Sequence, residues 1–218
     1  MLINFMYSFI IRFLRHPDPA IIASLDPILG GPGWQNRLDP KLEPAAAVEQ
    51  LFRNTLKTAG NFQHVISTRI DKSVADQPHF FLAYGTKDRA GLLAFRDIEY
   101  KALREHARNR AAAKGRKRES KTGSADLFPD FEMDVQEASV DDVVANQKVA
   151  ATAHLVGTLR ELKSMKFESV VDILLEAFML RETNVKDICV EMWRGGIIAN
   201  TWGPTNRKPT DETLIKLL

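Results

Sequence analysis

The sequence has little cysteine, few aromatic residues and almost no net charge. A single cysteine, Cys189, occurs among 218 residues, which excludes an internal disulfide and a zinc site built from several cysteines. The net charge of +2 is too small to create an overall field that would attract nucleic acid. Hydrophobic residues make up 44% of the chain, so a substantial core can form. We expect a cytoplasmic protein, because a lack of paired cysteines suits a reducing compartment.

Long apolar runs are also absent. Residues 1–14 begin with an apolar stretch, but Asn4 and Arg12 fall within it, and it is far shorter than the roughly 20 residues that span a bilayer. The stretch lacks the basic start and the small-residue cleavage site of a secretory signal. We therefore predict a buried strand running into a helix, and no membrane partner.

Common catalytic signatures are missing as well. The five histidines show no spacing typical of metal ligands, and neither G-x-S-x-G nor H-E-x-x-H occurs. The glycine cluster at residues 30–33 follows a predicted helix and has no Lys-Ser or Lys-Thr after it, so it does not fit a phosphate-binding loop. We therefore assign no catalytic residue and no metal site. Cys189 falls on the apolar face of a predicted helix, where we expect it to be buried.

The chain does contain a strand, a loop and a helix over residues 79–101. The apolar, aromatic run 80–84 predicts a buried strand, and apolar residues spaced three to five apart from residue 92 onward predict a helix. Gly85 would give room for the turn between them. Residues 86–88 would lie at the carboxyl end of the strand, where α/β sheets place their working residues. An ordinary structural joint explains these residues equally well, and we prefer that explanation.

The segments before residue 79 complete an α/β layer. Helices are predicted over residues 18–28 and 44–60, the second ending in a left-handed cap at Gly60-Asn61. Alternating apolar residues predict a strand over residues 62–70. Its short connection to the strand at residue 80 predicts an antiparallel pair, as found late in a larger α/β sheet. We predict a partial Rossmann-like domain over residues 1–115.

The pattern changes past residue 145. Apolar stripes predict three short helices, at residues 149–163, 167–180 and 183–194. A strand at 197–199 follows, and residues 203–206 suit a hairpin turn. Three helices followed by a β-wing predict an α+β winged helix-turn-helix domain over residues 145–218.

The predicted third helix has a mixed outward face. Its cations are Lys186 and Arg194, and the wing adds Arg207 and Lys208. Asp187 and Glu191 lie on the same face, and two carboxylates would repel phosphates, whereas a DNA-reading helix presents cations and amides. Protein interaction is therefore an alternative use of this domain.

Charge is segregated between these two domains. Nine Lys or Arg residues face only two Glu between residues 101 and 121, whereas seven Asp or Glu and no Lys or Arg occur between 124 and 142. One interpretation is a solvated helix and a flexible acidic linker, residues 116–144, that fold back on each other. The other is contact with nucleic-acid phosphates, without base stacking because residues 101–121 contain no aromatic residue. The candidate cations are Arg108, Arg110, Lys114, Arg116, Lys117 and Arg118.

Several of these stretches together resemble the three-Cys-motif partner proteins. The similarity lies in L-I-N-F-M-Y-S-F-I-I-R-F at residues 2–13, in F-F-L-A-Y-G-T-K-D-R-A-G-L-L-A-F at residues 80–95, in a helix ending near a Gly-Trp loop and in the terminal winged helix. Asn4, Phe5 and Arg12 match positions that follow the family's Asp-Pro loop. Gly91 matches the glycine that opens its late helix.

The resemblance implies a bacterial methyltransferase-like Rossmann domain followed by a winged helix. It also implies a partner, a radical-SAM-like protein with a three-cysteine motif encoded nearby. The family's glycine-rich cofactor loop and Asp-Pro loop lie upstream of the matching residues, so this chain resembles the carboxyl-terminal part. That implies no bound S-adenosylmethionine unless an upstream half is supplied, and a non-catalytic role in nucleic-acid or partner-protein interaction. The alternatives are an active S-adenosylmethionine-dependent methyltransferase subunit and a winged-helix transcriptional regulator.

Overall fold

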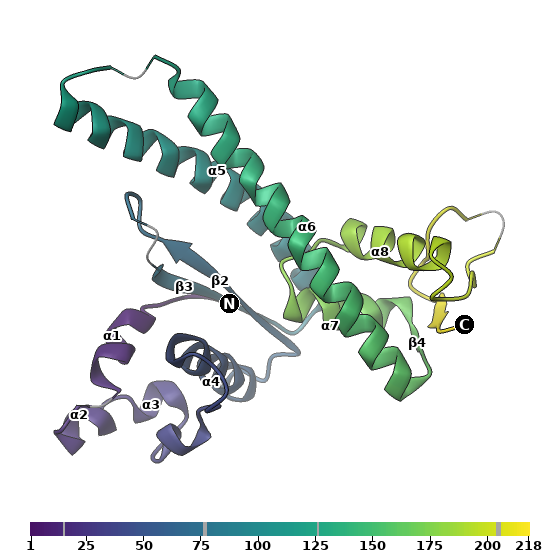
Figure 1. Ribbon diagram of the computed structural model, residues 1–218. Coiled ribbons are helices and arrows are strands. Elements are labelled where there is room, and N and C mark those ends of the chain that lie inside the picture. Colours follow the sequence, from purple (N-terminus) through teal and green to yellow (C-terminus); the bar gives the residue numbers. More distant parts are fainter. Residues whose placement is uncertain (15, 76–77, 126, 204–205) are drawn as a thin grey trace. The chain divides into compact units, whose positions relative to one another are not determined.

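The computed structural model describes residues 1–14, 16–75, 78–125, 127–203 and 206–218. The chain divides into two compact units, Met1–Arg89 and Ala90–Leu218 (Figure 1). Each unit combines helices with a small antiparallel sheet, which confirms the predicted mixture of α and β structure.

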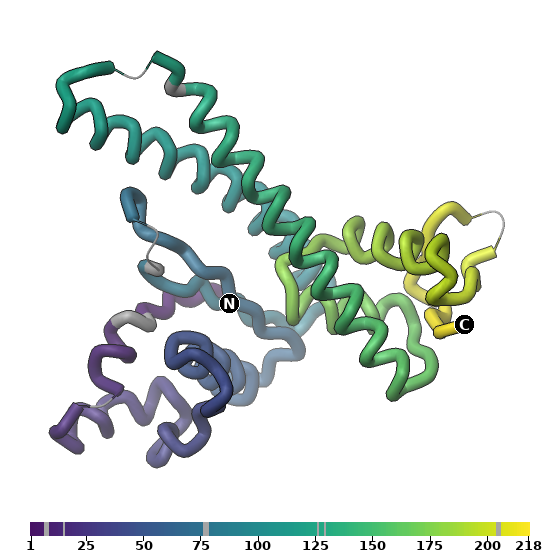
Figure 2. The backbone as a smooth tube through the Cα atoms, viewed as in Figure 1, coloured from purple at the N-terminus to yellow at the C-terminus, as the bar shows by residue number. Residues whose placement is uncertain are grey.

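The first unit is a three-stranded sheet with helices between its first two strands. In chain order its elements are β1 (Leu2–Phe5), α1 (Tyr7–Phe13), α2 (Pro19–Ala23), α3 (Asp26–Leu29), the 3-10 helix η1 (Trp34–Arg37), α4 (Pro44–Ala59), β2 (His64–Asp71) and β3 (Pro78–Thr86). Strand β3 lies in the centre and pairs antiparallel with both β1 and β2, so those two strands are parallel to each other. Figure 2 follows the chain from β1 through these helices and back to the sheet at β2.

Helix α4 packs an apolar face against this sheet. Val48, Leu51, Phe52 and Leu56 recur at helical spacing and are buried. The ring of Phe5 on β1 stacks on that of Phe52, with centroids 3.9 Å apart. The predicted strand, helix and antiparallel strand pair are therefore confirmed, and they share one hydrophobic core.

The helix predicted over residues 18–28 is instead two short helices. Asp18 caps the first as expected, because its Oδ1 accepts a hydrogen bond from the Ala20 amide at 2.9 Å. Helix α2 ends at Ala23, and α3 begins at Asp26 with Pro27 in its first turn. Proline has no N–H to continue the hydrogen bonds of a preceding helix, whereas it fits the first turn of a new one.

Gly85 lies inside β3 rather than in the turn after it. A Cβ atom at Gly85 would lie 2.6 Å from the ring of Phe62, and one at Gly60 would lie 2.1 Å from the same ring. The Phe62 ring therefore packs against two positions that have no side chain. Asn61, with φ of 47°, makes the left-handed turn at the end of α4, as predicted for that helix end.

The second unit begins with two long helices that form a hairpin (Figure 1). These are α5 (Arg89–Thr122) and α6 (Pro129–Leu162), followed by β4 (Ser164–Lys166), α7 (Phe167–Ala177), α8 (Glu182–Arg194) and β5 (Leu214–Lys216). Strands β4 and β5 pair antiparallel, and Ile198 forms an isolated bridge with Leu217. Of the predicted hairpin turn at residues 203–206, Pro204 and Thr205 lie outside the described residues.

The structure divides the chain at a different place from the predicted boundary at residue 115. The residues expected to form a flexible acidic linker, 116–144, belong mainly to α5 and α6. Helix α5 joins the second unit through Arg96, whose Nε donates to the Leu175 carbonyl at 2.8 Å, near the end of α7. The acidic segment is helical because its carboxylates find cations on α5, so low hydrophobicity did not mean disorder here.

Candidate functional site

Two of the predicted phosphate-binding cations, Arg108 and Arg118, pair with carboxylates of the same hairpin. Arg108 Nη1 lies 3.1 Å from Asp134 Oδ1 and 3.2 Å from Glu137 Oε2, and Arg118 Nη2 lies 2.8 Å from Glu132 Oε2. Hydrogen bonding to Glu137, with the charge of Asp134, raises the pKa of Arg108. The interpretation in which the basic and acidic segments fold back on each other therefore matches the structure.

A third cation, Arg104, extends this set of ion pairs toward the base of the hairpin. Arg104 Nε donates to Glu137 Oε1 at 3.1 Å, and its Nη1 donates to the Tyr100 hydroxyl at 3.1 Å. The Tyr100 hydroxyl, Glu137 and Asp141 together raise the pKa of Arg104. Tyr100 also donates a hydrogen bond to Asp141 on α6. Glu137 thus bridges Arg104 and Arg108, which lie one turn apart on α5.

The other predicted cations of this segment lie along α5. Arg116 and Lys117 are exposed, whereas Arg110 and Lys114 are half-buried. Lys114 and Lys117 border a shallow hollow of about 250 Å³, together with Arg118, Lys121 and Thr122. Exposed cations thus remain near the hairpin tip, and their contact with phosphates stays a prediction.

The outward face of α8 is also neutralised from within the chain. Lys186 pairs with Glu182 at 2.7 Å, and Lys208 pairs with Asp187 at 2.6 Å, which ties the segment before β5 to this helix. Glu191 pairs with Lys148 of α6 at 2.8 Å. Arg194 and Arg207 are exposed. Apart from the paired cations, the face offers the exposed Arg194 and Arg207 rather than a continuous basic surface.

The positions matched through the family resemblance are divided between the two units. Asn4 and Phe5 lie on β1, with Asn4 exposed and Phe5 buried, and Arg12 is exposed in the last turn of α1. Gly91 lies in the first turn of α5, in the other unit. Residues 86–88 form the structural joint that we preferred, because the Thr86 hydroxyl bonds both the amide and the carbonyl of Asp88.

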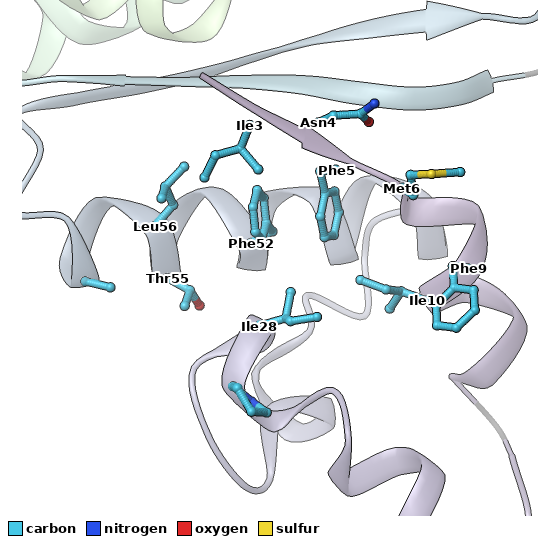
Figure 3. A pocket seen from close by; sticks show the side chains of 12 residues that line it. Ile3, Asn4, Phe5, Met6, Phe9, Ile10, Ile28, Phe52, Thr55 and Leu56 are labelled. Atoms are coloured by element: carbon cyan, nitrogen blue, oxygen red, sulfur yellow. The ribbon is translucent and has the colours of Figure 1, made fainter. Parts of the chain in front are cut away.

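An apolar cavity of about 480 Å³ opens in the first unit beside β1 (Figure 3). Ile3 and Phe5 of β1 and Phe52 and Leu56 of α4 point toward it, whereas the Asn4 side chain points away from α4. Asn4 and Thr55 are the polar residues of the lining, and no charged residue among those described lines it. Three apolar side chains of the lining are unusually exposed, Met6 at 49%, Phe9 at 55% and Ile28 at 43%, and Leu2 on β1 is exposed as well, at 57%.

Strand β1 also leaves one edge of the sheet open. Met1 and Gly85 exchange both backbone hydrogen bonds, at 2.7 and 2.9 Å, which makes them a hydrogen-bonded pair. Such pairs alternate along an antiparallel ladder, so Ile3 and Phe5 bond β3, whereas the amides and carbonyls of Leu2 and Asn4 point outward. No strand among the described residues pairs with that outer edge.

Sequence reasoning did not identify this cavity. It predicted a buried strand running into a helix over residues 1–14. One signal was available, because α1 carries apolar residues around more than one face, namely Phe9, Ile10, Ile11 and Phe13. An amphipathic surface helix has a single apolar stripe, so a wider apolar perimeter indicates a second contact surface.

The single thiol of the chain lies in the hydrophobic core. Cys189 is buried as predicted, and burial raises the pKa of its thiol to about 12. Across the described residues no group of three or more His, Cys, Asp or Glu side chains is placed to hold a metal ion. The helices of this part of the chain include none with the length and apolar character of a membrane span. No protein-family model matches the sequence, and the curated proteins and solved structures likewise show no match to it.

Proposed function

We propose that this chain is a non-catalytic interaction protein that binds a partner protein rather than nucleic acid. The observation that carries this proposal is the internal pairing of charge. Arg108, Arg118, Lys186 and Lys208 each have a carboxylate partner within the chain. Binding phosphates through these cations would first require breaking those pairs, whereas a protein partner could use exposed apolar surface without that cost.

The arrangement of strands and helices supports the family resemblance that motivates the partner. In the first unit the last strand, β3, turns back antiparallel between two parallel strands, which agrees with the end of a larger methyltransferase-like, Rossmann-like sheet. In the second unit the order from the end of α6 through β4, α7 and α8 to β5 agrees with a winged helix-turn-helix domain. The partner proposed by this resemblance is the radical-SAM-like, three-Cys-motif protein encoded nearby.

We propose no cofactor for the chain by itself. S-adenosylmethionine would bind only if an upstream half supplied the glycine-rich loop. Titration calorimetry with the chain alone should therefore show no heat of binding. A dissociation constant in the micromolar range would instead favour the alternative of an active methyltransferase subunit.

The proposed function is tested by comparing two ligands of the unmodified chain at low salt. We expect co-expression with the neighbouring gene product to give a stable complex, and a labelled 20-base-pair duplex DNA to show no binding. Tight DNA binding would contradict the proposal, and two double variants would then locate it. Loss of binding in Arg116→Glu/Lys117→Glu would place the DNA on α5, whereas loss in Lys186→Glu/Arg194→Glu would support the winged-helix regulator.

A further inference from the structure

We infer that two copies of this chain associate through their β1 strands, in an antiparallel pairing with Ile3 of each copy on the two-fold axis. The occupant of the open sheet edge is thus a second copy, and the two sheets become one of six strands. This inference concerns self-association and does not depend on the partner proposed above.

The outward backbone groups of β1 are self-complementary. Leu2 and Asn4 each direct one amide and one carbonyl to the open edge, and Ile3 lies between them. If the axis passes through Ile3, Leu2 of one copy lies opposite Asn4 of the other and exchanges both hydrogen bonds with it. The same holds with the copies interchanged, so four hydrogen bonds form and all the outward groups of these two residues are paired in both copies.

Charge does not oppose this symmetric contact. A two-fold axis brings each residue near it toward its own counterpart, so a charged side chain there would meet a like charge. Residues 2–6 have no charged side chain, and neither do the described residues that line the adjoining cavity. Edge strands that avoid self-pairing usually carry such charges, often Lys. Strand β1 has none.

The exposed apolar side chains on and near β1 provide enough buried interface area for a weak dimer. A large apolar side chain has about 200 Å² of accessible surface. Leu2, Met6, Phe9 and Ile28 are each roughly half exposed, so covering them in two copies removes on the order of 800 Å². That area is below the range of stable interfaces, so we expect a concentration-dependent dimer that half-dissociates at about 10–100 µM.

The first test is the mass of the full chain in solution. We expect sedimentation equilibrium between about 1 and 200 µM to show a monomer–dimer equilibrium. Leu2→Lys should shift the half-dissociation concentration upward at least about tenfold, because like charges then meet across the edge. Leu42→Lys is the matched control, since it places the same change on another exposed leucine of the first unit. The two variants should have equal melting temperatures.

The second test uses disulfide cross-linking to determine the register of the two β1 strands. In the proposed pairing Ile3 faces its own counterpart in a non-hydrogen-bonded pair, with Cα atoms about 4.5 Å apart, within the range of a disulfide. In a Cys189→Ala background, Ile3→Cys should therefore form a covalent dimer on mild oxidation. Leu2→Cys should not, because its counterpart lies two residues away along the ladder, about 7 Å, and the roughly 5 Å between the strands adds to this, which puts the two Cα atoms beyond the range of a disulfide.

Two results would overturn the inference. One is that the chain remains a monomer at 200 µM. If Leu2→Lys also abolished binding to the neighbouring gene product, that partner rather than a second copy would bind the β1 edge. The other is a dimer that Leu2→Lys does not weaken and that Ile3→Cys does not cross-link, which would place self-association elsewhere. Neither result bears on whether the chain binds a partner protein, which the co-expression experiment measures separately.

Discussion

Arg96 joins α5 to α7 through a buried guanidinium. Its Nη1 lies 2.6 Å from Glu99 Oε2, with side-chain exposures of 4% and 3%, and its Nε donates to the carbonyl of Leu175. A buried charge is tolerated when it is both paired and hydrogen-bonded, as here.

Replacing Arg96 should therefore destabilise the second unit strongly. We expect Arg96→Met to lower the free energy of unfolding by about 3–5 kcal/mol, because the Glu99 carboxylate then stays buried without the guanidinium. Chemical denaturation followed by circular dichroism measures this. Arg116→Met, at an exposed site on the same helix, should change stability by less than about 0.5 kcal/mol. If Arg96→Met/Glu99→Met proved less stable than Arg96→Met, the loss would not come from a buried carboxylate that lacks its arginine.

For single residues, the sequence predicts whether a side chain is buried better than it predicts which residues that side chain contacts. The position of Cys189 on a helical apolar stripe correctly indicated a core residue. The partners of Arg108 lie 26 and 29 residues away, in a segment that composition suggested was flexible. Periodicity reports which face of a helix is buried, but it does not report which distant residue covers that face.

The hairpin of α5 and α6 depends on Glu137, which contacts Arg104 and Arg108 together. Because the pKa of both arginines is raised in the folded hairpin, their contribution to its stability is fully present at every pH below their ordinary pKa and is lost only at still higher pH. Neutral pH with varied salt is therefore the informative condition, because salt screens exposed pairs.

We expect Glu137→Gln to loosen the hairpin toward its tip. Hydrogen exchange of the backbone amides in the first turns of α6 should accelerate roughly two- to five-fold at low salt, and by less at 1 M salt. Glu161→Gln is the control, since it removes an exposed carboxylate from the other end of the same helix. Equal acceleration in both variants would mean that these ion pairs do not hold the hairpin together.

The lengths of these two helices show where prediction from local pattern stops. The apolar pattern predicted one helix from residue 92 onward and the next only from residue 149, because many of the residues between are polar, whereas α5 extends to Thr122 and α6 begins at Pro129. A polar segment forms a stable helix when another helix supplies complementary charge and a few small contacts such as Ala111. This pairing of charges is a tertiary contact, so the local pattern of either segment alone does not predict it.

For the whole molecule, the division at Arg89 predicts which fragment is independent. Residues 90–218 should fold cooperatively without the first unit, because they contain the buried Leu92 and Arg96 of α5. Residues 145–218 lack those side chains, so that fragment should melt at a temperature lower by at least about 10 °C. Thermal melts of the two purified fragments provide the comparison. A shorter fragment as stable as the longer one would show that α5 contributes nothing to this core.

The ring of Phe62 between Gly60 and Gly85 restricts how this sequence can change over time. An alanine at either glycine collides with the ring while the phenylalanine is present, since an added Cβ would lie 2.1 or 2.6 Å from it. A smaller residue at position 62 removes that obstacle but leaves a void beside α4. Substitutions at these three positions therefore depend on one another. Phe62 must be replaced first, and only then can Gly60 or Gly85 be replaced without a collision.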